Sequence, residues 1–167
     1  MVTTSTPRAE LAHVRAAAES VPDPELPVVT LGMLGIVEDV VVDDDGTVAV
    51  TLLPTLAGCP AQDYMGADVR DAVGALPGVE AVDVRFVHVP RWTSDRITPA
   101  GLTALAAAGI APPAGDRSDT LVALGGLACP WCGSRETEQD SLFGPTPCRN
   151  IWFCRDCAQP FERFRRV

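Results

Sequence analysis

Two Cys-x-x-Cys pairs near the end of this sequence place the strongest constraint on its fold. The first pair is Cys129 and Cys132, and the second is Cys154 and Cys157. Each pair bends the backbone so that two thiolates face one side, and two pairs joined by a hairpin can enclose one tetrahedral metal ion. A segment of ~40 residues buries too little apolar surface to fold by itself. We therefore predict that metal binding supplies the folding free energy of this segment.

The composition is typical of a globular protein that stays in the cytoplasm. Hydrophobic residues make up 47% of the chain and charged residues 21%, as in ordinary globular domains. No apolar run approaches the ~20 residues that cross a bilayer, and the first ten residues lack the apolar centre of a secretion signal. In a reducing compartment, the six cysteines are expected as metal ligands or reactive thiols rather than disulfides. We predict a cytoplasmic protein with no membrane partner.

The distribution of charge argues against nucleic acid as a partner. The net charge is −9, and residues 1–125 carry seven arginines against 17 acidic residues. Residues 126–167 carry six arginines against five acidic residues, and four thiolates around a divalent cation would cancel that small excess. Nucleic-acid binding depends mostly on a basic face that neutralises phosphates. The cysteine-rich segment is therefore not expected to bind nucleic acid.

The hydrophobic pattern ahead of the cysteine pairs predicts a small α+β domain. An Asp-Gly turn at residues 43–46 indicates a β-hairpin, and Thr98 is expected to cap a last helix that ends before Gly109. The predicted order is helix, β-hairpin, helix, strand, helix. The first two helices are expected over residues 8–20 and 60–76, and the strands over 35–42, 47–53 and 79–89.

The chain divides into three predicted parts. Residues 1–108 form the α+β domain, residues 109–127 a Pro- and Gly-rich linker, and residues 128–167 a four-cysteine ribbon. Trp131 and Trp152 lie in or beside the cysteine pairs and are expected to cover the metal site or to form an interface, and the small size of the module favours the covering role. Cys148 lies six residues before the second pair, and we expect it to pack in the hairpin rather than bind the metal.

Cys59 is the candidate reactive group of the first domain. It precedes Pro60, the first residue of the predicted second helix, so backbone N–H groups and the helix dipole would favour its thiolate. The alternative is a small buried cysteine that packs under the helix start. Thr55 lies in the same loop, and Asp23 and Glu25 could supply carboxylates if the fold brings a proline-rich loop alongside.

Four motifs in this order resemble the MIP18 family, formerly called domain of unknown function 59. The motifs are Asp23-Pro-Glu-Leu-Pro27, Leu34-Gly-Ile-Val37, Thr55-Leu-Ala-Gly-Cys-Pro60 and Trp92-Thr-Ser-Asp95. With its appended four-cysteine ribbon, the chain resembles the PaaD branch of that family, which belongs to phenylacetate degradation. The similarity extends over about residues 8–166, because Phe143-Gly144 through Cys148 and Pro160-Phe161-Glu162 also fit this branch.

The resemblance implies a function in the maturation of metal centres. It implies a small α/β domain with a reactive cysteine at Cys59 and an acidic residue, Asp23, near it. The implied role is an accessory protein of phenylacetyl-CoA epoxidase that helps to assemble iron–sulfur or other metal centres and has no catalytic activity of its own. Expected partners are the epoxidase components, above all the iron–sulfur reductase. Cys59, with Asp23, Glu25 and Thr55, would bind iron or an iron–sulfur cluster only transiently.

Two other functions stay open from the sequence. The protein could be a structural component of the oxygenase without chemistry of its own. It could also be a rubredoxin-like electron carrier with iron at Cys129, Cys132, Cys154 and Cys157, because the ligand set alone does not separate iron from zinc. The long interval between the pairs favours one structural Zn²⁺ per chain.

One position departs from the usual ribbon pattern. Gly133 follows the first cysteine pair, but Ala158 follows the second, where glycine is commoner. The residue after such a pair often needs a positive φ, so Ala158 either costs about 1 kcal/mol, because it has a Cβ, or marks an altered turn.

Overall fold

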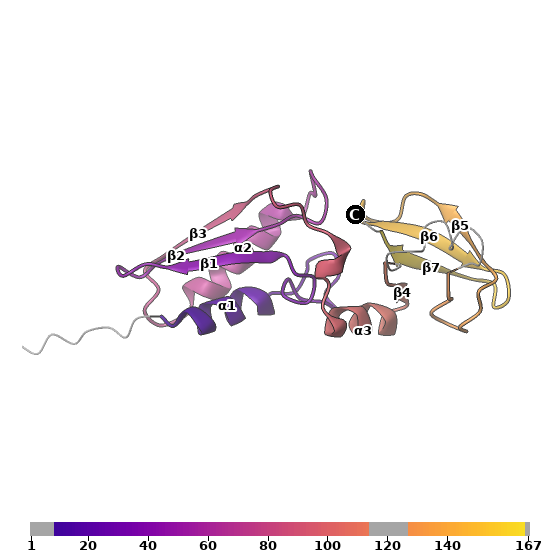
Figure 1. Cartoon of the computed structure of the whole chain (residues 1–167), viewed down its shortest axis with the longest axis horizontal. Coiled ribbons are helices and arrows are strands. Elements are labelled where there is room, and N and C mark those ends of the chain that lie inside the picture. Colours follow the sequence, from indigo (N-terminus) through magenta and orange to yellow (C-terminus); the bar gives the residue numbers. More distant parts are fainter. Residues whose placement is uncertain (1–8, 114–126, 166–167) are drawn as a thin grey trace, which may run out of the picture. The chain divides into compact units, whose positions relative to one another are not determined.

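The computed structural model describes residues 9–113 and 127–165, which form two compact units divided between Trp92 and Thr93. Each unit combines helical segments with one β-sheet (Figure 1). The predicted fold class is confirmed, because an α+β domain is followed by a small sheet that carries the four cysteines. Among the residues that the structure describes, no helix is long and apolar enough to cross a membrane.

The first unit is a three-stranded sheet with two helices on one face (Figure 1). Strand β2 is central; it pairs antiparallel with β1 and parallel with β3, and α2 makes the crossover between the parallel strands. The elements follow the predicted order, with shorter bounds: α1 (Leu11–Ser20), β1 (Val37–Val42), β2 (Thr47–Leu52), α2 (Gln62–Gly74) and β3 (Ala81–Phe86).

The predicted hairpin forms because the turn residues satisfy the backbone between β1 and β2. The Asp43 N–H donates to the Thr47 carbonyl at 2.8 Å, and the Gly46 N–H donates to the Asp43 carbonyl at 3.2 Å. Gly46 has a φ of +84°, a conformation that glycine adopts without steric cost. The turn therefore fixes the register that points Val48 and Val50 of β2 into the core, where both are fully buried.

Helix α2 begins two residues later than the predicted start at Pro60. Its N-cap is Ala61, and the Gln62 N–H donates to the Cys59 carbonyl at 3.4 Å. Pro60 and Ala61 thus belong to a turn that leads into the helix. The predicted apolar stripe is present, because Met65, Val69 and Val73 are buried.

Trp92 closes the first unit as a core residue. Its indole is almost fully buried and the Nε1–H donates to the Leu34 carbonyl at 2.8 Å. A buried indole N–H without a partner would be costly. This hydrogen bond therefore joins the end of the unit to the segment before β1.

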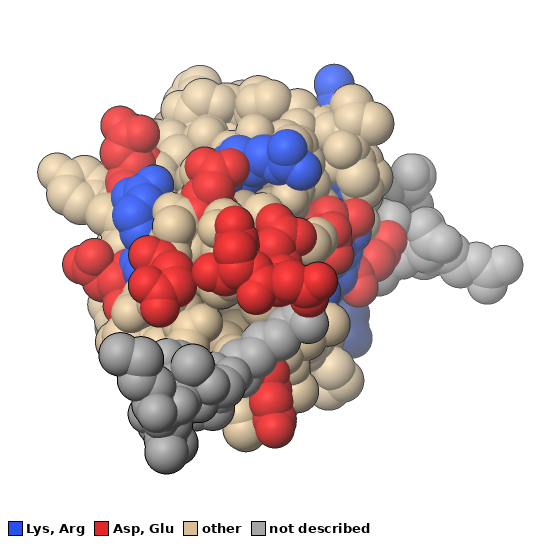
Figure 2. Space-filling model, turned by 90° about the vertical axis from the view of Figure 1, so that its left-hand side faces the viewer, with Lys and Arg blue, Asp and Glu red and all other residues tan. Residues whose placement is uncertain are grey.

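Acidic side chains gather at the end of the first unit that carries the β1–β2 turn (Figure 2). Asp43, Asp44 and Asp45 are exposed there, and Glu80 is adjacent because its N–H donates to the Gly46 carbonyl at 2.9 Å. This end is acidic, as the sequence predicts for the first domain. A phosphate-binding face would instead be basic.

The second unit is a four-stranded sheet in the order β4-β7-β6-β5, preceded by two helical segments. Strand β6 is antiparallel to β5 and β7, while β4 is parallel to β7. Thr98 caps α3 as predicted, because its Oγ1 accepts the Gly101 N–H at 3.1 Å. The bounds are η1 (Ser94–Arg96), α3 (Pro99–Ala107), β4 (Ile110–Ala111), β5 (Thr137–Ser141), β6 (Arg149–Cys154) and β7 (Gln159–Phe164).

One part of the predicted linker is a strand. Ile110 and Ala111 pair with Glu162 and Arg163 of β7, and Ala111 is buried in the ribbon core. Pairing with β7 removes the apolar side chains of this dipeptide from water, which is more favourable than leaving them exposed. The other domain boundaries stay predictions, and residues 114–126 of the linker lie outside the described residues.

Candidate metal centre and the cysteine loop

Each cysteine pair is followed by a residue with a positive φ. In the first, the Gly133 N–H donates to the Cys129 carbonyl at 2.8 Å, and Gly133 has a φ of +76°. In the second, Ala158 has a φ of +54°, whereas all the other described residues with positive φ are glycines. The expected positive φ at Ala158 is confirmed, so this turn stores the strain of a Cβ in the left-handed region.

The four thiols converge on one point with the spacing of a tetrahedral metal site. All four Sγ atoms lie within 4.8 Å of one another. The cross-pair distances are 3.7 Å from Cys129 to Cys157 and 3.6 Å from Cys132 to Cys154. Metal–sulfur bonds of about 2.3 Å at tetrahedral angles place sulfurs about 3.8 Å apart, whereas a disulfide needs about 2.05 Å. The donor set therefore fits a four-thiolate metal ion.

Two of these thiols have opposite electrostatic environments. The backbone N–H of Cys157, and after it that of Asp156, stabilises the Cys154 thiolate and lowers the pKa of Cys154 to about 7. Burial raises the pKa of Cys157 to about 12. Cys154 is thus the thiol that ionises first, while Cys157 needs a neighbouring cation to become a thiolate.

The core of the second unit packs directly against these ligands. Cys129 and Cys154 are buried in one cluster with Ala111, Trp152 and Phe161. Trp152 therefore covers the site as predicted. Its ring lies 5.6 Å from the Arg163 guanidinium, and its Nε1–H donates to Asn150 Oδ1 at 3.1 Å.

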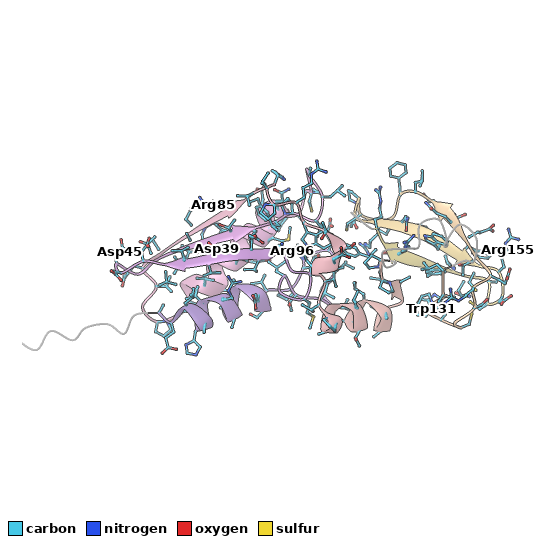
Figure 3. All side chains as sticks on the ribbon, viewed as in Figure 1. Asp39, Asp45, Arg85, Arg96, Trp131 and Arg155 are labelled. Atoms are coloured by element: carbon cyan, nitrogen blue, oxygen red, sulfur yellow. The ribbon has the colours of Figure 1, made fainter. Side chains whose placement is uncertain are left out.

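Trp131 does not take the predicted covering role. Trp131 lies in the second unit (Figure 3). The residue is 56% exposed, and its Nε1–H donates to the Pro160 carbonyl at 3.2 Å. Its ring also lies against Gly109, where a Cβ would come within 2.1 Å of the ring. The aromatic ring is held at the surface of the unit because glycine leaves room for it.

Ser134 and Asp156 join the two turns and were not predicted. Ser134 Oγ donates to Asp156 Oδ2 and accepts the Glu136 N–H at 3.0 Å, while the Ser134 carbonyl accepts the Cys129 N–H at 2.8 Å. The pairing of Ser134 with Asp156 depends on the approach of turns that are distant in sequence. Only the position of Ser134 next to Gly133 could have suggested a role beside the metal.

Cys148 is separate from the thiol cluster. It is buried, and its Sγ lies 3.1 Å from Thr146 Oγ1. The expectation that it packs in the hairpin agrees with this position, since the cluster contains the other four cysteines of the ribbon and not this one.

The proline-rich loop and the Cys59 loop lie side by side in the first unit. A cavity of about 330 Å³ is lined by Pro24 and Glu25 from one loop and by Pro60, Ala61 and Tyr64 from the other. Tyr64, which sequence reasoning missed, is largely exposed at this cavity. The sequence signal for its place at this cavity was its position four residues after Pro60, about one helical turn along the chain. Cys59 itself is half-buried, immediately before Pro60.

The predicted partners of Cys59 have structural positions of their own. Asp23 is buried, and its Oδ1 accepts the backbone N–H groups of Glu25 at 2.9 Å and Leu26 at 2.8 Å, which shapes the proline-rich loop. Thr55 is also buried. Within the described ranges, Cys59, Asp23 and Glu25 do not form a second group of three metal ligands. Their roles at the Cys59 loop stay predictions.

Two family models match the chain, one on each part. Residues 11–84 match the model described as iron–sulfur cluster assembly protein, and residues 114–165 match the PaaD zinc beta ribbon domain. The chain is 34% identical over 155 residues to a protein of Escherichia coli (strain K12) that is named as a putative subunit of 1,2-phenylacetyl-CoA epoxidase. That alignment covers 93% of this chain and 92% of the relative.

This chain belongs to the MIP18 family, in the branch that carries a PaaD zinc ribbon. A second relative, the Fe–S protein maturation auxiliary factor of Bacillus subtilis (strain 168), is 37% identical over 86 residues. Those residues are 52% of this chain and 83% of the relative. A solved structure of a DUF59 domain from Bacillus anthracis superposes with a TM-score of 0.54 and 31% identity. It covers 57% of this chain and 90% of that domain. The MIP18 fold thus accounts for the first part of the chain, and the ribbon is the addition.

Proposed function

We propose that this protein is an accessory factor of a phenylacetyl-CoA epoxidase that assists the assembly of iron–sulfur centres. The observation that carries the proposal is the joint presence of both domains in one chain. Relatives that match the first domain of this chain are named as Fe–S protein maturation factors. A relative that matches nearly the whole chain is named as a putative epoxidase subunit. The iron–sulfur reductase of the epoxidase is the proposed client, and cytoplasm is the proposed compartment.

In this proposal the two units have separate tasks. Cys59 binds iron or a cluster transiently, because a single thiolate at a loop can both capture and release a soft metal. The remaining ligands would come from the client. The ribbon holds one structural Zn²⁺ at Cys129, Cys132, Cys154 and Cys157 and serves as the docking module. Neither task is catalysis.

The direct test is reconstitution of the reductase cluster with this protein, without it, and with the Cys59→Ser variant. We expect faster or fuller cluster formation with the wild type and the level of the protein-free reaction with Cys59→Ser. Cys148→Ser is the matched control, because it removes a thiol outside both proposed sites. Equal cluster content in all reactions would refute a maturation role.

A structural component of the oxygenase is the second candidate, and the name of the Escherichia coli relative as an epoxidase subunit favours it. It predicts co-purification with the epoxidase at fixed stoichiometry and no effect of Cys59→Ser on cluster content.

A rubredoxin-like electron carrier is the third candidate, because the thiol spacing suits iron as well as zinc. Anaerobic purification with metal analysis and a visible spectrum separates these cases. A red protein with one iron per chain would indicate the carrier. A colourless protein with one zinc per chain would exclude it.

A further inference from the structure

The four thiols of the ribbon differ in how far they are open to solvent. Cys129 and Cys154 are buried in the core cluster. Cys157 is half-buried, whereas Cys132 is exposed. A metal acceptor in solution replaces the ligands of a bound ion one after another, and an exposed thiolate is the one that it reaches first. Exchange of the ion is therefore expected to begin at Cys132.

Ser134 and Asp156 join the two turns next to this exposed thiol. Ser134 Oγ donates to Asp156 Oδ2. The Ser134 backbone N–H also donates to the thiol of Cys132, in its own turn, and the Asp156 N–H likewise donates to the thiol of Cys154. Since the Cys132 and Cys154 sulfurs lie 3.6 Å apart, the side-chain hydrogen bond runs alongside this pair of ligands and ties one turn to the other.

Ser134 is held in the orientation that this hydrogen bond needs. Its Oγ accepts the Glu136 N–H at 3.0 Å, and its carbonyl accepts the Cys129 N–H at 2.8 Å. A hydroxyl that accepts from the backbone still has its single proton to donate, and here the acceptor is the Asp156 carboxylate. Hydrogen bonds to an ionised acceptor are stronger than those between neutral groups.

The neighbouring contacts fix Cys154 more firmly than Cys132. Cys154 is the last residue of β6 and pairs with Thr137 of β5. Cys132 precedes β5 and belongs to no strand. Trp131 beside it holds the first turn to β7, because its indole N–H donates to the Pro160 carbonyl, but this bond does not reach the second turn. The side-chain bond between the turns is therefore a contact that keeps the exposed thiol beside Cys154.

We propose that the Ser134–Asp156 hydrogen bond is a latch that slows the loss of metal from the Cys132 side of the ribbon. Both residues act as positioning residues, because the group of four ligands at this site consists of cysteines alone. Without the hydrogen bond, the first turn is freer to carry Cys132 away from Cys154, and an acceptor reaches the site more often. The latch presupposes the metal site of the proposed function and is independent of the role proposed for Cys59.

The test is the rate at which the full zinc-loaded chain releases Zn²⁺ to an excess of a chelator. Ser134→Ala and Asp156→Ala should each release it about tenfold faster, the lower end of the effect of groups that orient metal ligands. The double variant should release it no faster than the faster single variant, because both changes break the same hydrogen bond. Asp140→Ala, which removes an exposed carboxylate of β5, is the matched control and should behave like the wild type.

Asp156→Asn separates the hydrogen bond from the charge, since an amide oxygen still accepts the Ser134 hydroxyl. Its release rate should stay within about threefold of the wild-type rate. A rate equal to that of Asp156→Ala would show that the carboxylate acts through its charge and would overturn the latch. Equal rates in the wild type and Asp156→Ala, or effects that add in the double variant, would also overturn it.

Two further measurements keep the result clear. The visible spectrum of the cobalt-loaded chain checks that the variants retain four thiolate ligands. If Ser134→Ala takes up no metal, the comparison of Asp156→Ala with Asp156→Asn decides the question. A wild type that binds no zinc would overturn both the latch and the metal site of the proposed function. A wild type that binds zinc without changing the cluster content of the client would refute the maturation role alone.

Discussion

The two units present cysteine in opposite ways. In the second unit four thiols meet within 4.8 Å, and two of them, Cys129 and Cys154, are buried in the core, so the chain supplies all four ligands of the site. In the first unit a single half-buried Cys59 stands beside an open cavity and is not part of a three-ligand group in the described residues. A four-thiolate site can hold its ion and stabilise a fold, whereas the role proposed for Cys59 is transient binding by a single thiolate. The ribbon is therefore expected to depend on its metal for stability, and transfer by Cys59 stays a proposal.

The largest expected effect is the loss of one ribbon ligand. Cys154→Ser should abolish tight metal binding and unfold the β5–β7 sheet, because a structural zinc contributes on the order of 10 kcal/mol to folding. Amide hydrogen exchange measures this, with protection lost in the ribbon and retained in the first unit. Cys148→Ser should retain both the metal and the protection. Retained ribbon protection in Cys154→Ser would contradict metal-dependent folding.

The first unit should depend on its apolar core instead. Trp92→Ala should lower the free energy of unfolding of that unit by about 3–5 kcal/mol, because it empties a buried indole site. Trp92→Phe should cost less, about 1–2 kcal/mol, mainly for the unpaired Leu34 carbonyl. Urea unfolding monitors both. Metal content should stay at the wild-type level, and a fall in metal content would show that the two units are not energetically separate.

Metal affinity should fall as the pH falls. Binding requires thiolates, and in the metal-free chain the pKa of Cys157 is raised to about 12 and that of Cys154 lowered to about 7. Metal therefore displaces the Cys157 proton throughout this range and also the Cys154 proton below about pH 7. The affinity should drop at least about tenfold per pH unit, more steeply below pH 7. Competition with a chelator between about pH 6 and pH 8 checks this. A pH-independent affinity would disprove thiolate ligation.

A smaller effect should follow from the strained turn in the ribbon. Ala158→Gly should raise the stability of the second unit by about 1 kcal/mol, because glycine adopts positive φ without a steric cost. Ala106→Gly, in α3, is the matched control and should lower stability by up to about 1 kcal/mol. Thermal unfolding of the metal-loaded protein compares them. A loss of stability in Ala158→Gly would show that the turn is not strained.

The smallest effect on stability should come from Cys59. Cys59→Ser should change the free energy of unfolding by less than about 1 kcal/mol, because the side chain is only half-buried. The same variant should remove the proposed effect on client cluster content. A large loss of stability would favour the alternative of a buried structural cysteine.

The sequence predicted those features that depend on local chemistry. The four-thiol site follows from two short spacings, the hairpin from an Asp-Gly turn, and the positive φ of Ala158 from its place after a cysteine pair. The helix start at α2 was misplaced by two residues, because Pro60 suits a turn as well as a first helical position.

Features that depend on tertiary approach were not predictable. Strand β4 is only two residues long and has no periodic signal, so Ile110 and Ala111 were assigned to a linker. The Ser134–Asp156 hydrogen bond and the exposed position of Trp131 also depend on which segments meet in the fold. The residues alone left open whether the Pro24 and Pro60 loops meet, the family resemblance implied that they do, and the structure places both loops at one cavity.

The short strand β4 has a consequence for how this protein can be divided. Within the described part of the chain, β7 is flanked by β6 on one side and by β4 on the other. A fragment that begins at the first cysteine pair would retain every metal ligand but would leave one side of β7 without its neighbour. Unprotected strand edges recruit other chains and promote aggregation. The shortest well-behaved ribbon therefore begins before Ile110, about twenty residues ahead of its first ligand.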